Sequence, residues 1–578
     1  VNIVEVSDGS SIDVSSKGLK GASNIPYASG SYGGYGGYVG VLDTVPAYGN
    51  IYAPVHFGSG GMTHDAKSSG RGGGSLYLEI AEELILDGEI TSSGSSNTGY
   101  GSGSGGSVWI DTQVVSGSGA ISANGGDASG YHTYSLGGGG GGRVALYYSD
   151  ATQFDLSKVY AFGGSPQNKS KAGGAGTVYL EDKNLPQVEA ILRIDNGTNT
   201  EKPGITPIEK SALELANGII SNGNNNSLIT LIGDFSEKDS DLVLDNVTVE
   251  LNGVNSFDNI ELFNGAKITS AKAVNEDSPI LEIFANNINV PEGTAIDVSA
   301  KGLGPDGTGT HYGGSYGGMG GIYDGKGTPN EPFGNKYVPD QFGRGGTRDN
   351  DSAHSRGGGA VYLEASGELT LNGQILANGQ NGDEIDDYTG GGSGGSIWVN
   401  ADVITGSGSV YANGASGANH RYHQYGGGGG GRVAIYYNDA SGFDLANVYA
   451  NGGSAYYSAT AGGNGSVVKQ LINTFTGDNV LAADYHGYDD TSIIVDGGTL
   501  SVNGTHSFVS IELINGAVLT YSNPENSFDI TLSGDLIINS GAHVDISGLG
   551  NSGEGVVTDE FAGGSHGGLG GGLSNDIH

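Results

Sequence analysis

The sequence predicts an all-β protein, a right-handed parallel β-helix or β-solenoid with glycine-rich loops inserted and packed together on one side. Three observations predict this fold. A long module occurs twice and begins a third time, apolar residues alternate with a period of two within each module, and glycine-rich stretches separate the alternating segments. Such an internal repeat favours a modular, extended protein over one built around a single catalytic centre.

The repeat is carried by matched segments. RGGGSLYLE at 71–79 returns as RGGGAVYLE at 356–364, and GGGGGGRVALYYSD at 137–150 returns as GGGGGGRVAIYYND at 426–439. The expected organisation is a first module at 1–182, connecting strands at 183–295, a second module at 296–470, connecting strands at 471–543, and the start of a third module at 544–578. Because both ends fall inside these patterns, we expect a section of a longer polypeptide.

Equivalent apolar positions recur through each module. They fall at Ile12, Ile90, Ile121 and Val159 in the first copy, and at Ile296, Ile375, Val410 and Val448 in the second. Each strand–turn–strand unit is predicted to form one rung that stacks on the next and buries a continuous apolar column. Asn-Gly turns leave a second interpretation open, antiparallel hairpins in an array of β-sandwiches.

Glycine is the most unusual component, with 111 residues and no Gly-X-Y period. The run of six glycines keeps its length in both modules and ends each time in Arg followed by a strand. Two interpretations follow: irregular but ordered loops, or extended three-fold glycine helices packed side by side. Such helices have no internal hydrogen bonds, so their backbone groups need partners in neighbouring segments.

Composition excludes several classes of partner. The net charge is −39, which repels nucleic acid and anionic lipids and favours divalent cations. Cysteine is absent, so disulfides and thiolate metal sites are excluded. No apolar run approaches the ~20 residues of a membrane-spanning helix.

Arginine and tryptophan recur at matched positions. The arginines Arg71, Arg143, Arg356 and Arg432 flank glycine runs, and we expect them to donate hydrogen bonds to glycine carbonyls, with anion binding as the alternative. Trp109 and Trp398 alternate with apolar neighbours and are expected in the core.

Aromatic residues with histidine precede both six-glycine runs, as Tyr131, His132 and Tyr134, and as Tyr422, His423 and Tyr425. They are candidates for a sugar-stacking platform or for caps on the glycine segments. Zinc is not expected at these histidines, since no second ligand recurs with them. No cofactor is required by the sequence.

Acidic clusters are candidates for Ca²⁺ binding through oxygen ligands, or for solvated surface charge. They comprise Asp383, Glu384, Asp386 and Asp387, then Asp239, Asp241 and Asp245, and also Asp489 and Asp490. The triplicated Asp13, Asp297 and Asp545 are the candidates for carboxylate catalysis, expected on the outer face of a strand and without a partner. We therefore expect no enzymatic activity.

The pattern GGSVWI, GSGAISANGG and GGGGGGRVALYY resembles glycine-rich repeats of very large secreted or surface-attached microbial proteins, commonly described as adhesin-like. The resemblance covers 12–182, 296–470 and the start of the third copy. The glycine runs are also similar in segment type to the stacked polyglycine helices of phage tail-tip adhesins, without their motif order. The first resemblance implies an extracellular location and a structural or adhesive role, and it transfers no catalytic residue.

The function expected from the sequence is a segment of an extracellular fibre, stalk or sheath of a microbial cell, able to self-associate end to end. The alternatives are an adhesin that binds cell-surface or environmental polysaccharide and, less favoured, a polysaccharide-active β-helix enzyme.

Overall fold

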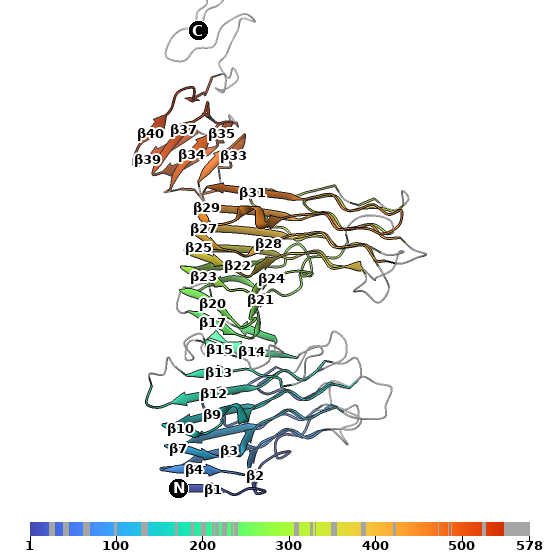
Figure 1. Ribbon diagram of the computed structural model, residues 1–578, viewed down its shortest axis with the longest axis vertical. Helices are drawn as coiled ribbons and strands as arrows, with labels where there is room; N and C mark the ends of the chain where they lie inside the picture. Colours follow the sequence, from blue (N-terminus) through green and yellow to red (C-terminus); the bar gives the residue numbers. More distant parts are fainter. Residues whose placement is uncertain are drawn as a thin grey trace, which may run out of the picture. The chain divides into compact units, whose positions relative to one another are not determined.

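Short strands with alternating apolar residues dominate the structure (Figure 1), and the predicted all-β character is confirmed. The computed structural model describes residues 1–547, with gaps at 22–28, 38–45, 62–69, 97–100, 129–136, 168–170, 186–189, 198–203, 211–212, 214–218, 222–227, 233–234, 236–240, 306–310, 324–327, 330, 348–354, 383–388, 420–423, 472, 484, 487, 490 and 523–527. The chain forms two compact units, Val1–Lys469 and Gln470–His578.

The first twelve strands visit three parallel sheets in strict rotation, and each return adds a strand beside the previous one. The first sheet holds β1 (Ile3–Val6), β4 (Glu83–Leu86), β7 (Val114–Gly117) and β10 (Asp150–Phe154). The second holds β2 (Ser11–Asp13), β5 (Glu89–Thr91), β8 (Ala120–Ser122) and β11 (Val159–Tyr160). The third begins with β3 (Ser75–Glu79), β6 (Ser107–Asp111), β9 (Arg143–Tyr148) and β12 (Thr177–Asp182).

The predicted equivalent apolar positions are directly paired, which confirms their assignment. Ile12 pairs with Ile90, Ile90 with Ile121, and Ile121 with Val159. In the second module Ile296 pairs with Ile375, Ile375 with Val410, and Val410 with Val448. Seven of these eight side chains are buried, Ile12 being partly exposed. The ladders form because in-register parallel strands place equivalent side chains above one another.

The third sheet continues to 15 strands, and an 8-stranded sheet accompanies it. The remaining members of the 15-stranded sheet are β13 (Ile191–Arg193), β15 (Ile219–Ser221), β17 (Leu242–Asp245), β19 (Gly253–Ser256), β20 (Asn259–Phe263), β22 (Leu281–Ala285), β23 (Asn287–Val290), β25 (Ala360–Leu371), β27 (Ser396–Gly406), β29 (Arg432–Phe443) and β31 (Ser466–Leu471). The 8-stranded sheet holds β14 (Ile205–Glu209), β16 (Leu228–Ile232), β18 (Thr248–Glu250), β21 (Lys267–Thr269), β24 (Ala295–Asp297), β26 (Gln374–Leu376), β28 (Ser409–Tyr411) and β30 (Val448–Tyr449).

The second module repeats the arrangement of the first with longer strands. The first part of β25 pairs with β22 and its last part with β23. One strand here therefore spans what β3 and β4 span separately in the first module. Short 3₁₀ turns at Leu156–Lys158 and Leu445–Asn447 precede β11 and β30, and an aspartate caps each of them.

The expected uniformly parallel stacking is wrong at one junction. Strand β13 pairs antiparallel with β12, and the pairs that follow it are again parallel. The strand direction of the large sheet therefore reverses between the first module and the connecting strands. This reversal lies in a stretch without glycine-rich insertions, where the module pattern is interrupted.

From its third strand onward unit 2 rotates its strands through three parallel sheets, and its buried core includes Val495, Leu500 and Leu513. The strands are β32 (Thr474–Thr476), β33 (Asn479–Leu481), β34 (Ser492–Asp496), β35 (Thr499–Val502), β36 (Gly504–Phe508), β37 (Ser510–Ile514), β38 (Val518–Thr520), β39 (Phe528–Leu532), β40 (Leu536–Ile538) and β41 (His543–Val544). Most of the expected third module lies outside the described residues.

The two tryptophans do not lie where they were expected. Val108 and Ile110 are fully buried, and Trp109 between them lies on the opposite face of β6, partly buried against Tyr77 at a ring distance of 4.4 Å. Trp398 repeats this position against its tyrosine neighbour in the second module. Strand alternation explains the correction, because successive side chains point to opposite faces.

Figure 1 shows extended segments leaving the strand stack of unit 1 on one side, in both modules. Among the residues that the structure describes, no helix has the length and apolar character needed to cross a bilayer.

Candidate functional site

The six-glycine run of the first module is hydrogen-bonded to segments far away in the sequence. Four consecutive amides donate at 2.7–2.9 Å: Gly139 to Gly126, Gly140 to Gly30, Gly141 to Gly174 and Gly142 to Ala123. Residues three apart thus donate to the same segment, and the two amides between them donate to two other segments. A repeat of three residues per turn is the geometry of an extended three-fold helix.

The second module reproduces this pattern at equivalent positions. Gly428 donates to Ala415, Gly429 to Gly314, Gly430 to Gly463 and Gly431 to Ala412. We call these runs, together with the segments that accept from them, the glycine lattice. The duplicated partners show that the lattice is an ordered part of each module, so its glycines are not a flexible tether.

Close approach of backbones explains why the lattice needs glycine. A Cβ atom built on Gly140 would lie 2.0 Å from the Gly34 carbonyl oxygen, and one on Gly141 would lie 2.1 Å from the carbonyl oxygen of Ala161. Neither glycine adopts the left-handed backbone region. The missing side chain, and not backbone freedom, is therefore what these positions require.

An arginine closes each six-glycine run, and in the first module this arginine is buried. Arg143 is 4% exposed, and its Nε donates to the Tyr48 carbonyl oxygen at 3.0 Å and its Nη1 to Thr177 Oγ1 at 3.1 Å. The guanidinium also lies 5.6 Å from the ring centre of Tyr32, whose hydroxyl is 2.6 Å from Ser107 Oγ. Burial lowers the pKa of Arg143. We call this set the arginine–tyrosine junction.

The same junction recurs in the second module. Arg432 Nε donates to the Phe333 carbonyl oxygen at 2.8 Å, and its Nη1 donates to Ser466 Oγ at 3.0 Å. Its guanidinium lies 5.5 Å from the ring centre of Tyr316, whose hydroxyl is 2.7 Å from Ser396 Oγ. Phe333 occupies the position that Tyr48 has in the first module. The arginine keeps its bond to the backbone carbonyl there without the tyrosine hydroxyl, so the contact depends on the carbonyl.

The acceptors of the arginines differ in part from those expected. Arg71 Nη2 donates to the Gly18 carbonyl oxygen at 3.0 Å, as predicted. Arg143 and Arg432 donate instead to the carbonyls described above, and Arg356 donates to the Ala273 carbonyl. None of these three acceptor carbonyls belongs to a glycine, and each lies at least 83 residues before its arginine in the sequence.

A cavity of about 200 Å³ beside Arg143 bears on the alternative of anion binding. It is lined by Tyr35, Tyr48, Tyr52 and Glu209, among others. The carboxylate of Glu209 would repel an anion there, and the guanidinium already donates to two neutral oxygens. The geometry therefore favours a structural role for Arg143.

Burial raises the pKa of Tyr48 and of Tyr316 to about 12, compared with about 10 in an unfolded chain. The folded state therefore favours the neutral phenols. Their contribution to stability is present below pH about 10 and is lost as the pH rises through about 12. We expect the melting temperature to fall over this window, and to fall less steeply in the double variant Tyr48→Phe, Tyr316→Phe. Tyr457→Phe is the control, because Tyr457 is 63% exposed. If the melting temperature falls as steeply in the double variant as in this control, ionisation of Tyr48 and Tyr316 is not the cause of the fall.

Five of the six candidate sugar-stacking residues lie outside the described residues: Tyr131, His132, Tyr134, Tyr422 and His423. The sixth, Tyr425, is 1% exposed and stacks on His311 at a ring distance of 5.0 Å. A buried ring cannot present its face to a sugar, so the platform interpretation is wrong for Tyr425. Its position at the start of the second six-glycine run agrees with the capping interpretation.

The candidate calcium ligands Asp383, Glu384, Asp386 and Asp387 lie outside the described residues, as do Asp239 and Asp490. Asp241 and Asp245 accept hydrogen bonds from Asn259 and Asn264, at the two ends of the neighbouring strand β20. The triplicated aspartates share one local role: Asp13, Asp297 and Asp545 each accept from the backbone N–H two residues later, at 2.7–2.9 Å. This contact fixes a turn after a strand.

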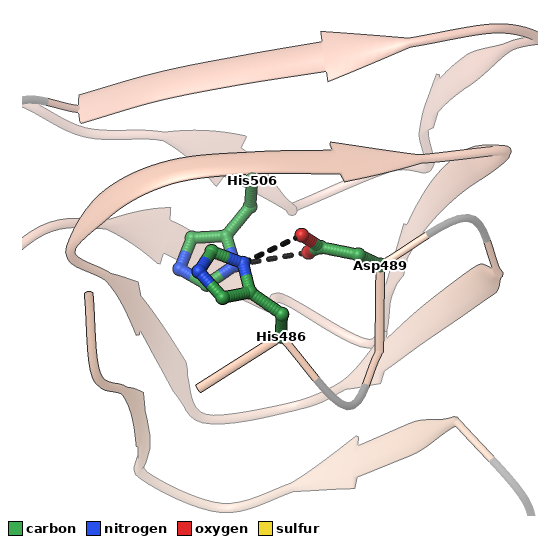
Figure 2. Close-up of side chains that lie close together, drawn as sticks. All are labelled: His486, Asp489 and His506. Atoms are coloured by element: carbon green, nitrogen blue, oxygen red, sulfur yellow. Dashed lines mark hydrogen bonds and ion pairs between the residues drawn. The ribbon is translucent and has the colours of Figure 1, made fainter. Parts of the chain in front are cut away.

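Unit 2 brings together three side chains that the sequence analysis did not group (Figure 2). His486 Nδ1 lies 2.7 Å from Asp489 Oδ2, and His506 Nδ1 lies 3.0 Å from the other carboxylate oxygen. His486 and Asp489 lie between β33 and β34, whereas His506 lies on β36. In the sequence Asp489 stands out only as part of an acidic pair with Asp490.

The environments of these three side chains differ. His506 is 1% exposed, Asp489 20% and His486 56%. Burial alone would raise the pKa of Asp489, but the contacts with His486 and His506 outweigh burial and lower it.

Comparisons with protein-family models, with curated proteins and with solved structures give no match to this chain, so its geometry is the basis for the function proposed below.

Proposed function

We propose that this chain is a structural segment of an extracellular protein, built as a β-solenoid that the glycine lattice stiffens on one side. The observation that carries the proposal is the duplicated lattice, in which each six-glycine run donates to three other segments. In this proposal the glycine runs are three-fold polyglycine helices. Each run crosslinks excursions from different turns of the solenoid, so bending the stack requires breaking hydrogen bonds in the lattice.

Two further features support a mechanical role. Each arginine–tyrosine junction joins the end of a glycine run to a neighbouring strand of the large sheet, β12 in the first module and β31 in the second, which couples the lattice to the strand stack. The net charge of −39 keeps neighbouring chains soluble and apart except where specific contacts form. A fibre, stalk or sheath of a microbial cell suits both features, and the resemblance to surface-attached repeat proteins implies the same location.

The proposal is tested by electron microscopy of the purified chain and by labelling of the cells that produce it. We expect stiff rods, and antibodies against the chain should label intact cells without permeabilisation. Compact globular particles would contradict the structural role, and labelling only after permeabilisation would contradict the location. Sedimentation over a range of concentrations tests end-to-end assembly, which requires larger species at higher concentration.

The carbohydrate-binding adhesin stays a prediction that rests on residues outside the described part of the chain. The candidate carboxylates Asp13, Asp297 and Asp545 each hold a turn, so the described geometry gives no specific support to a polysaccharide-active enzyme.

A further inference from the structure

We propose that His486, Asp489 and His506 bind a divalent transition-metal ion of the zinc class. The argument begins with His506, whose two ring nitrogens both face oxygen atoms. Nδ1 lies 3.0 Å from Asp489 Oδ1, and Nε2 lies 3.1 Å from the carbonyl oxygen of Asn503. A neutral imidazole has one donor and one acceptor, so one of these two contacts needs a positive charge beside the ring.

That charge is either an added proton or a cation between the ring and the carboxylate. The contact with Asn503 is the one that a metal-bound ring would make. When Nε2–H donates to this backbone carbonyl, Nδ1 carries the free lone pair and faces the carboxylate. A histidine that binds a metal through one nitrogen commonly donates its other N–H to a backbone carbonyl, which fixes the ring and its tautomer.

The second histidine supplies a converging ligand. His486 Nδ1 contacts the other oxygen of the same carboxylate, and Figure 2 shows both rings facing Asp489. The ligand atoms of the three residues lie within 4.8 Å of one another. Ligands on a tetrahedral zinc ion lie about 3.3 Å apart, given bonds of about 2.0–2.2 Å. The longer separations must therefore shorten on binding, and His486 is the most exposed and so the least constrained of the three side chains.

The ligand types select the class of ion. Imidazole nitrogen suits Zn²⁺, Cu²⁺ and Ni²⁺, whereas Ca²⁺ takes oxygen ligands. Three protein ligands leave a fourth position, and the side of the cluster formed by His486 is open to solvent. A bound ion would tie the connection between β33 and β34 to strand β36, and so crosslink two parts of unit 2 that are separated in sequence.

The test is zinc titration of the full chain after treatment with a chelator, with a chromophoric indicator as the competing ligand. We expect saturable binding of one ion at this cluster, weakened at least about 100-fold by His486→Ala and by Asp489→Asn, since loss of an outer-shell partner alone commonly costs about 10- to 100-fold. His543→Ala, at an exposed histidine of the same unit, is the control and should bind as the unchanged chain does.

His486 is mostly exposed, so its replacement tests binding without removing a core residue. Zinc should also raise the melting temperature of the unchanged chain by several degrees, and should not raise that of His486→Ala. Equal zinc binding by the unchanged chain and by both ligand variants would overturn the proposal, as would the absence of saturable binding. A preference for Ca²⁺ over Zn²⁺ would overturn the assigned class of ion.

Discussion

Replacing Gly430 by alanine is expected to open the glycine lattice of the second module. The new Cβ atom would lie 2.0 Å from the Ala450 carbonyl oxygen and 2.4 Å from the Gly465 nitrogen. Overpacking a protein interior commonly costs about 1–3 kcal/mol where side chains can shift. Here the obstructing atoms are backbone atoms, so we expect the free energy of opening of the neighbouring lattice amides to fall by at least about 3 kcal/mol.

Gly463 provides a matched control in the same lattice. Its carbonyl accepts the hydrogen bond from Gly430, yet a Cβ atom at Gly463 would meet its nearest neighbour, Met319 N, at 3.4 Å. Its backbone does not adopt the left-handed region. Gly463→Ala should therefore change the free energy of opening by no more than about 1 kcal/mol, in either direction.

Amide hydrogen exchange measures this difference locally, because it reports the opening of individual segments as well as global unfolding. Gly141→Ala in the first module should behave like Gly430→Ala, since its Cβ atom would lie 2.1 Å from the Ala161 carbonyl oxygen. Similar exchange in Gly430→Ala and Gly463→Ala would show that the segments are packed more loosely than described, and would remove the mechanical basis of the proposed function.

The strand stack was predictable from sequence because its signals are local. Alternation with a period of two identified Ile90, Ile121 and Val159, and in-register pairing then aligned them. The same alternation places Trp109 on the face opposite Val108 and Ile110. The prediction of a core position for Trp109 was therefore inconsistent with the alternation on which it was based. The antiparallel pairing of β13 had no such signal, since strand direction depends on the path of a connection and not on side-chain alternation.

The lattice and the metal-binding candidate depend on distant contacts. The sequence left irregular loops and three-fold helices both open, because the partners of Gly140 and Gly141 lie at Gly30 and Gly174. Likewise, His486 and His506 come together only once the strands between them are stacked. One clue in the sequence is that two strands, β34 and β35, separate these histidines. Whether the two side chains meet depends on how those strands pair, which the sequence pattern does not give.

Replacing Arg143 by lysine is expected to destabilise the first module although the charge is kept. Arginine donates through a planar fork, here to the Tyr48 carbonyl and to Thr177 Oγ1 at once, while its face lies near the Tyr32 ring. Lysine cannot reproduce this geometry, and its ammonium would be buried with fewer partners. Because a hydrogen bond from a charged donor contributes about 1.5–3 kcal/mol, we expect a loss of about 3 kcal/mol in the free energy of unfolding.

Arg71→Lys is the control, since Arg71 is exposed and its guanidinium donates to the Gly18 carbonyl. Its effect should stay below about 1 kcal/mol, as for other surface substitutions. Arg432→Lys should destabilise the second module in the same way but to a smaller extent, because Arg432 makes the equivalent contacts and is less buried than Arg143. If Arg143→Met is as stable as the unchanged chain, the junction requires only a long side chain that fills the space. If both Arg143→Lys and Arg143→Met are destabilised, the two-armed donation is what couples the glycine lattice to the strand stack.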